Sequence, residues 1–367
     1  MKRQIVGIIF AGIVLCGMLG SSLSVSVPSS TIYVNHDNAQ GPWDGTLEHP
    51  FQSIQDGINH SLDGGTVYVF SGTYYEHVRV NRTLTLMGED RETTIIDANH
   101  SSVCVFLASG NVRITGFTMQ NSGTAWYNDA GVGIKNLGLT SNGNIIEGNI
   151  MQYNYYGIFA WASDNNMISN NIIRNNINDG IYFQDYDTFT TIINNSIIGN
   201  GVNGIRMEGD SSDHNDLRSN VIDNNSANGV ISYGDHCVIE GNHISRSING
   251  IRVYGYSTSI QKNNITQNDI GLTIVLAIQC VVEGNTFLNN QKDATFTYYL
   301  MQRVMLPFVQ FPQITKWHAN FWDKALSGPK RIIGKMDFSL FVDIGIPWVN
   351  MDFSPAHAPY VNHKKGG

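Results

Sequence analysis

Three aspartates and one arginine in the middle of the chain have the side chains that saccharide-cleaving chemistry requires. Asp187, Asp210 and Asp235 recur 23 and 25 residues apart, and Arg206 lies between the first two. Glycosidases use two carboxylates about 5–9.5 Å apart, and a stacked repeat would place these aspartates at ~4.8 Å per step. Arg206 or Arg252 could act as a base or as a clamp on an anionic sugar, and closely spaced carboxylates could recruit Ca²⁺. The three aspartates and Arg206 are the candidate catalytic site; the alternative is that aspartates in turns bond only to their own backbone.

Two Asp-His pairs form a second candidate site. Asp213-His214 and Asp235-His236 are 22 residues apart, so a repeat of that length would stack the two histidines. Imidazole and carboxylate groups together could ligate copper or zinc. The chain has no Met-rich or Cys-x-x-Cys motif that would select copper. Two surface turns that share a dipeptide are the alternative, so copper and Ca²⁺ are candidate cofactors that the pattern does not require.

Aromatic, charged and amide side chains follow a glycine in five successive segments. Alternation along a strand sends the first and third residues after the glycine inward, and the second and fourth outward. The outward residues are Phe159, Trp161, Tyr182, Gln184, Arg206, Glu208, Ile231, Tyr233, Arg252 and Tyr254. Rings stack on the apolar faces of sugars, and charged groups bond hydroxyls or uronates. This row predicts binding of an extended polysaccharide or cell-surface glycan. Against it, sheets favour aromatic residues in any case, and the C-terminal segment could cover this face.

A repeat of 21–25 residues is the element that would position these side chains. Its first marker is an asparagine that recurs at Asn149, Asn171, Asn195, Asn220, Asn242, Asn264 and Asn285. A second asparagine follows five residues later, at Asn154, Asn176, Asn200, Asn225 and Asn290. Short β-branched runs separate Asn, Gly and Asp turns, which is typical of strands that gain stability only by stacking on neighbouring coils. The pattern predicts an all-β, right-handed, single-stranded parallel β-helix in which most asparagines form structural amide ladders.

The domain organisation follows from this repeat. We expect a signal peptide over 1–26, an N-terminal strand and capping helix over 31–63, about ten coils over 64–325, and a closing segment over 326–367. Ile54, Ile58 and Leu62 should form the buried side of the capping helix.

The N-terminus indicates export. Lys2 and Arg3 precede an apolar run over 5–19, which is short for a membrane span. An uncleaved anchor, or a lipid anchor at Cys16, are the alternatives and the only expected contacts with a membrane. The protein is therefore expected to be extracellular, on the cell surface or periplasmic.

Composition excludes some partners. The net charge is −8 and only 14% of residues are charged, so no basic stripe for a nucleic acid is expected. Cys104, Cys237 and Cys280 are too few for a disulfide framework and lie in apolar runs, which predicts buried thiols.

Several segments resemble one family of exported β-helix proteins. They are Thr31-Ile-Tyr-Val-Asn35, Gly41-Pro-Trp-Asp-Gly45, Ser53-Ile-Gln-Asp-Gly57, Gly72-Thr-Tyr-Tyr-Glu76, Leu86-Met-Gly-Glu-Asp90, Asn320-Phe-Trp-Asp323 and Ile346-Pro-Trp348. The chain resembles NosD-like proteins, named after the periplasmic accessory protein of copper-dependent nitrous oxide reductase, within the wider class of carbohydrate-binding and sugar-hydrolase β-helices. The resemblance implies a pectin-lyase-like solenoid and suggests copper handling through the two histidines. The Gly-His-Gly and Arg-Ile-Lys signatures of β-helix pectin hydrolases are missing.

We therefore expect an exported protein that binds extended carbohydrate without requiring catalysis. A polysaccharide lyase or glycoside hydrolase and a copper-handling accessory protein are the alternatives.

Overall fold

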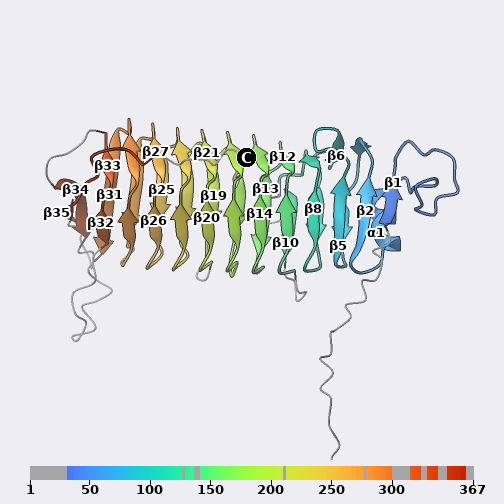
Figure 1. The fold of residues 1–367 in the computed structure, drawn as a ribbon, viewed down its shortest axis with the longest axis horizontal. Coiled ribbons are helices and arrows are strands. Elements are labelled where there is room, and N and C mark those ends of the chain that lie inside the picture. The colour runs from blue at the N-terminus through green and yellow to red at the C-terminus, as the bar shows by residue number, and fades with distance from the viewer. Residues whose placement is uncertain are drawn as a thin grey trace, which may run out of the picture.

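Short parallel strands stack along one axis and build a solenoid of about ten turns (Figure 1). The computed structural model describes residues 31–125, 129–135, 141–209, 212–276, 279–299, 315–323, 329–337 and 345–360. The expected signal peptide and Asp210 lie outside these ranges. From Gly65 onward, each strand pairs with the strand three positions further along the chain, so each coil contributes three strands and the solenoid has three faces. The predicted all-β parallel β-helix is confirmed.

Face 1 carries the glycine-led strands. It consists of β4 (Val78–Val80), β7 (Val105–Leu107), β10 (Ala130–Lys135), β13 (Tyr156–Trp161), β16 (Ile181–Phe183), β19 (Asn203–Met207), β22 (Asn228–Ser232), β25 (Asn249–Val253), β28 (Ile270–Val275) and β31 (Lys292–Tyr299).

From Leu84 onward, each strand of face 2 follows a strand of face 1 after a bend. It consists of β1 (Thr31–Val34), β2 (Gly65–Val69), β5 (Leu84–Gly88), β8 (Arg113–Thr115), β11 (Ile145–Glu147), β14 (Met167–Ser169), β17 (Thr191–Ile193), β20 (Asp216–Arg218), β23 (Val238–Glu240), β26 (Ser259–Gln261), β29 (Val281–Glu283) and β32 (Lys316–His318).

Face 3 is a separate sheet of 11 strands. It consists of β3 (Gly72–Tyr74), β6 (Thr94–Asp97), β9 (Thr118–Gln120), β12 (Ile150–Gln152), β15 (Ile172–Arg174), β18 (Ser196–Ile198), β21 (Val221–Asp223), β24 (His243–Ser245), β27 (Asn264–Thr266), β30 (Thr286–Leu288) and β33 (Phe321–Trp322).

Each face sends one row of aliphatic side chains into the core. On face 1, Ile158, Ile181, Ile205, Val230 and Ile251 are fully buried and pair in register from coil to coil. Residues of the same shape therefore stack at ~4.8 Å, which removes their apolar surface from water. The inward half of the predicted alternation is confirmed.

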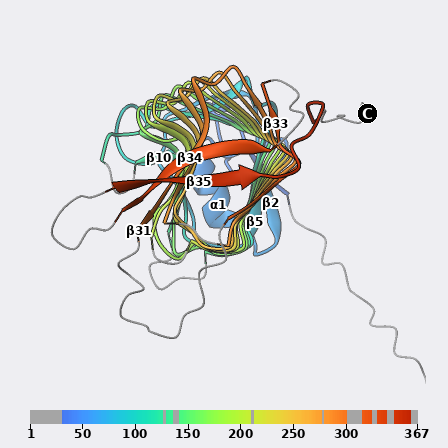
Figure 2. The same cartoon turned by 90° about the vertical axis from the view of Figure 1, so that its left-hand side faces the viewer.

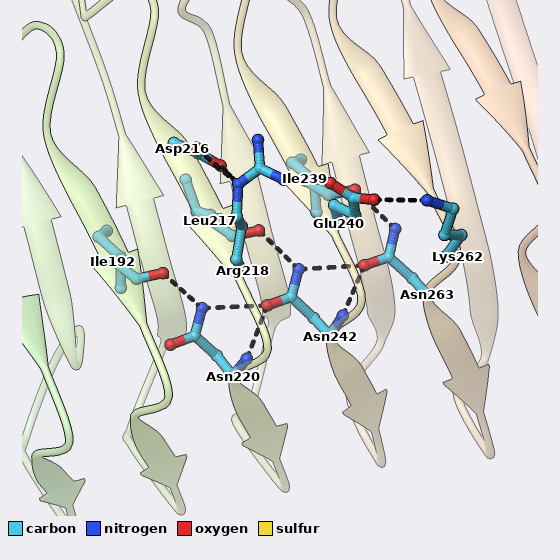
Figure 3. Close-up of polar contacts among 10 residues, drawn as sticks. All are labelled: Ile192, Asp216, Leu217, Arg218, Asn220, Ile239, Glu240, Asn242, Lys262 and Asn263. Carbon is cyan, nitrogen blue, oxygen red and sulfur yellow. Dashed lines mark hydrogen bonds and ion pairs between the residues drawn. The ribbon is translucent and has the colours of Figure 1, made fainter. Parts of the chain in front are cut away.

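Buried asparagines join the coils at the bend between faces 2 and 3. The backbone N–H and Nδ2 of Asn220 both donate to Oδ1 of Asn242, at 2.9 and 3.0 Å, and Nδ2 also donates to the Ile192 carbonyl at 2.8 Å (Figure 3). Asn242 bonds in the same way to Asn263, and not to Asn264 as the sequence pattern predicted. Asn264 instead begins β27 and pairs with His243 on face 3.

Ion pairs cross the solvent side of face 2 beside this ladder. Arg218 pairs with Asp216 and with Glu240 on the next coil, and Glu240 also accepts from Lys262 at 2.8 Å (Figure 3). Because these groups are partly exposed, each pair adds at most about 1 kcal/mol to stability.

A helix closes the N-terminal end of the stack. α1 (Ile54–His60) begins after Ser53, whose side chain accepts from the Asp56 N–H, and Ile54 and Ile58 are fully buried. Leu62 follows the helix and is 62% exposed, so its predicted place on the buried side is wrong.

An antiparallel hairpin closes the C-terminal end. β34 (Lys330–Asp337) and β35 (Gly345–Asp352) lie across the last coil (Figure 2) and pair in parallel with β31 and β32. Oδ2 of the buried Asp352 accepts from the Asn320 N–H, Asn320 Nδ2 and Trp322 Nε1, each at 3.1 Å. Asn320 is the last asparagine of the ladder, and Asp352 accepts the two hydrogen bonds that a further asparagine would otherwise accept.

Candidate functional site

The predicted saccharide-binding residues do lie on the outer side of face 1, but only some are accessible. Phe159 and Tyr182 are 1% and 8% exposed, so the prediction that their rings are free to contact a ligand is wrong. Six of the others are partly exposed, namely Trp161, Gln184, Arg206, Glu208, Arg252 and Tyr254. Tyr233 is 37% exposed. The accessible residues therefore lie mainly on or just after β19, β22 and β25, although Ile231 on β22, which was also expected to face outward, is only 8% exposed.

Contacts between aromatic rings explain the burial. The Tyr156 ring centroid lies 5.6 Å from that of Phe159 and 5.1 Å from that of Tyr182. Tyr156 directly precedes Gly157, where a Cβ would lie 2.4 Å from Cγ2 of Ile173 in the core. Because the glycine itself faces inward, the residue before it is placed outward. In five successive coils the residue before this glycine is polar or aromatic, and this was the sequence signal for the additional row: Tyr156, Asp179, Asn203, Asn228 and Asn249.

This additional row contributes a buried acid. Asp179 precedes Gly180 and has no exposed surface; its Oδ1 accepts from the N–H and Nδ2 of Asn203 at 2.9 and 2.7 Å. Its Oδ2 lies 3.8 Å from Nη1 of Arg206 and has no hydrogen-bond partner. Burial, partly offset by Asn203 and Arg206, raises the pKa of Asp179 to about 6.

Arg206 connects Asp179 to the accessible surface. Its Nη2 is paired with Oε2 of Glu208, and its guanidinium carbon lies 4.8 Å from the centre of the Tyr182 ring. The Tyr182 hydroxyl donates to the same Glu208 oxygen at 2.7 Å. Partial burial alone would raise the pKa of Glu208, but the hydrogen bonds from Arg206 and Tyr182 hold it below its usual value. Asp179, Tyr182, Arg206 and Glu208 form one connected group, which we call the acid cluster.

The two predicted catalytic aspartates that the structure describes, Asp187 and Asp235, do not stack on each other. Asp187 is fully buried in a bend, where its Oδ1 accepts from the Ser163 N–H at 2.8 Å. Asp235 occupies a different column, where its Oδ1 accepts from the Tyr256 N–H at 2.6 Å. Asp187 and Asp235 therefore do not occupy equivalent positions of their coils and cannot stack. The reason is that the turns between faces 1 and 2 differ in length. Of the three predicted catalytic residues within the described ranges, Arg206 alone is part of the acid cluster.

The two histidines do stack on neighbouring coils, as predicted. The rings of His214 and His236 are 5.0 Å apart and 7° from parallel, and Phe189 continues the stack 4.9 Å from His214. All three have φ of 54–56°, which marks equivalent left-handed turn positions. The in-plane lone pairs of parallel rings point side by side and do not converge on one ion.

The aspartates beside these histidines, Asp213 and Asp235, accept hydrogen bonds from backbone N–H groups of the next coil. Oδ1 of Asp213 accepts from the Asp235 N–H at 2.7 Å. Within the described ranges, no group of three or more His, Cys, Asp or Glu side chains is arranged to hold a metal ion.

Two family models match the chain. The model described as "Periplasmic copper-binding protein (NosD)" matches residues 58–231, and the model of the right-handed β-helix region matches residues 186–304. No curated protein sequence is significantly similar to the chain.

Solved structures with a similar fold include carbohydrate-active proteins. The A-module of mannuronan C-5 epimerase AlgE6 from Azotobacter vinelandii has a TM-score of 0.53 at 17% identity, covering 73% of this chain and 81% of its own. The Dettilon tailspike protein has a TM-score of 0.50 at 12% identity, covering 74% and 64%. XylC in complex with xylose has a TM-score of 0.50 at 11% identity, covering 89% and 73%. At these identities the similarity shows the fold alone.

No helix in the described part of the chain is long and apolar enough to span a bilayer. The strand register, the asparagine ladders and the two family matches all identify the same repeat architecture. The chain is a right-handed parallel β-helix repeat protein that is similar to the NosD family over residues 58–231.

Proposed function

We propose that the chain is exported and binds an extended saccharide along the accessible part of face 1. The observation that carries this proposal is that Arg206, Glu208, Tyr233, Arg252 and Tyr254 all keep exposed surface on or just after three successive strands, with the buried Ile231 between the two arginines. Tyrosine faces and charged hydrogen-bonding groups are the two features that sugar recognition needs. The charged N-terminal segment and the periplasmic description of the matching family support export.

Tyr233 and Tyr254 give this surface rigidity. Their rings are 4.3 Å apart and 7° from parallel. Side chains that already hold each other in place lose little conformational entropy when a ligand binds, so more of the contact energy appears as affinity.

Replacing both tyrosines tests the proposal. We expect Tyr233→Ala with Tyr254→Ala to weaken binding about tenfold or more for any oligosaccharide that the wild type binds on a glycan panel. Tyr75→Ala with Phe353→Ala is the matched control, because these two rings are each 73% exposed and lie near opposite ends of the solenoid. Equal loss in both double variants, or no binding by the wild type, would contradict the proposal.

Saccharide cleavage at the acid cluster is a second candidate function. A carboxyl group with a pKa of about 6 can take up or release a proton near neutral pH, as general acid–base catalysis requires. Because Asp179 is fully buried, a sugar could reach Oδ2 only after Arg206 moves.

Product formation separates this candidate from binding alone. An enzyme would release new reducing ends, or products with the absorbance of an unsaturated uronate. Asp179→Asn would then lower the rate by about two orders of magnitude while binding remains. Binding without product assigns the face to recognition only.

Copper handling, the third expectation, would have to use His214 and His236. Their stacked rings would need to rotate before both could bind one ion. A copper titration that is abolished by His214→Ala with His236→Ala would support it.

A further inference from the structure

Arg252 lacks the carboxylate partner that three other arginines of the central coils have, and Arg174 bonds only to the Gln152 amide. Arg206, Arg218 and Arg246 pair with Glu208, Glu240 and Asp223. Within the described ranges, no carboxylate lies within ion-pair distance of Arg252. Its guanidinium carbon lies 5.2 Å from the centre of the Tyr254 ring, and its buried Nε has no hydrogen-bond partner.

Such an arginine is an open anion receptor. The guanidinium group stays charged at all accessible pH values and has five donors. A partly buried charge without a partner is unfavourable, and an anion placed against it satisfies both its charge and its free donors. Arg206, in contrast, is already neutralised by Glu208 and Asp179.

A second cation lies further along the same face. Arg252, Thr273 and Thr295 pair in register on β25, β28 and β31, and so form one outward row. Nζ of the exposed Lys292 donates to Oγ1 of Thr295 at 2.9 Å. In the part of the chain that the structure describes, Lys292 has no carboxylate partner either. Two coils separate Arg252 from Thr295, which is ~9.6 Å at ~4.8 Å per coil.

Within the described ranges, the nearby acids Asp269 and Asp293 are not within ion-pair distance of these two cations. Asp293 is paired with Lys330 at 3.1 Å, and Oδ1 of Asp269 accepts from Gln291 at 2.6 Å. The threonine between the two cations is also engaged, because Oγ1 of Thr273 donates to Asn249 at 2.9 Å. Arg252 and Lys292 are thus the free charged groups of this row.

We propose that the row from Arg252 to Lys292 recognises an acidic saccharide, with one uronate or sulfate group at each cation. This inference rests on the proposed saccharide-binding function and adds the substrate class. The ligand crosses the strands and follows the solenoid axis, with its acidic groups about two coils apart and its sugar rings beside Tyr233 and Tyr254. The net charge of −8 does not attract polyanions in general, so binding depends on these local groups.

Affinity electrophoresis of the full chain tests this inference. The gels contain polygalacturonate, dextran sulfate or neutral dextran, and the first two polymers distinguish uronate from sulfate. We expect retardation by at least one acidic polymer and weaker retardation by dextran. Arg252→Gln with Lys292→Gln should bind the acidic polymer about 10- to 100-fold more weakly, because two charge-assisted contacts are lost.

Matched controls remove one arginine and one lysine elsewhere. Arg246→Gln with Lys262→Gln changes the net charge equally, and both residues pair with acids away from face 1. These controls should leave retardation unchanged. Lys292→Gln alone changes an exposed side chain, so it tests the row without risk to the fold.

Three results would overturn the inference. Retardation by dextran that equals retardation by both acidic polymers would refute the acidic class while the saccharide face stands. Retardation by an acidic polymer that Arg252→Gln and Lys292→Gln leave unchanged would refute the row. No retardation by either acidic polymer would refute the inference, whereas the proposed function is refuted only if the wild type also binds nothing on the glycan panel.

Discussion

Asp187 shows how one side chain can oppose the stability of its own bend. It is fully buried, and only one of its oxygens has a partner, the Ser163 N–H. The equivalent position on neighbouring coils is Ser163 or Ser212, which can be buried without a charge. Burial first, and then the charges of Asp164 and Asp185, raise the pKa of Asp187 well above its usual value.

The sign of the pH effect follows from that shift. A carboxyl group whose pKa is raised by folding contributes stability below its unfolded pKa of ~3.9, and this contribution is lost as the pH rises through the folded pKa. Asp187→Asn cannot ionise and escapes the loss. We expect the variant to match the wild type near pH 4 and to exceed it by about 1–3 kcal/mol at pH 8, in urea unfolding measured across this range.

Asp63→Asn is the control, because Asp63 is exposed. Parallel curves for wild type and Asp187→Asn would show that the Asp187 carboxyl does not resist ionisation.

For single residues, the sequence predicted whether a side chain points inward or outward better than it predicted whether that side chain is exposed to solvent. Alternation placed Ile158 and Phe183 inside and Phe159 and Tyr182 outside, as observed. It could not predict that Tyr156 covers Phe159 and Tyr182, because that cover depends on the inward turn at Gly157. The acid cluster was missed for the same reason.

The amide ladder is the element that gives the coils their register. Asn263 accepts from the N–H and Nδ2 of Asn242, and its own Nδ2 donates to Asn285 and to the Ile239 carbonyl. The adjacent Asn264 is only partly buried, and its Oδ1 has no partner. Two neighbouring asparagines therefore have opposite structural roles.

This contrast gives a prediction with its control in the next residue. We expect Asn263→Ala to lower the free energy of unfolding by about 2–4 kcal/mol, because it leaves several buried groups without partners. Asn264→Ala should change it by less than about 0.5 kcal/mol. Chemical denaturation of the two variants measures the difference, and equal losses would contradict the assigned ladder.

Spacing alone could not choose between Asn263 and Asn264. Coils of 21 to 25 residues occur in this chain, so either asparagine fits the interval from Asn242. The choice depends on which amide reaches the Ile239 carbonyl, and this is fixed by the bend after β26. The same variation in turn length separated Asp187 from Asp235.

The whole molecule is a linear stack, and its stability should be lowest where the stack ends. Asp352 supplies the last acceptor for Asn320 and Trp322. In solenoids each unit contacts only its neighbours, so loss of an end contact loosens the end before the middle.

Hydrogen exchange can detect this local effect. We expect Asp352→Ala to increase exchange at amides of β32 and β33 by about tenfold or more, while β16 to β22 keep the wild-type rate. Glu283→Ala, at an exposed position, is the control. Uniform acceleration along the chain would show that the solenoid unfolds as one unit and that Asp352 is no local cap.

The architecture was the most predictable level. Two asparagine registers and one glycine register repeated together, and only stacked parallel coils satisfy all three. The pairing of the end hairpin was not predictable, because β34 and β35 do not follow the repeat and their partners lie on β31 and β32.

The amide ladder also bears on how such a chain can change its length. The N–H and Nδ2 of Asn195 donate to Oδ1 of Asn220, and the same two groups of Asn220 donate to Oδ1 of Asn242. Successive coils are therefore joined by the same pair of hydrogen bonds. A duplicated or deleted coil would meet complementary partners on both sides, whereas a partial coil would offset all three faces. Gene duplication in whole-coil steps can therefore lengthen or shorten the outer surface of face 1 and match it to longer or shorter ligands.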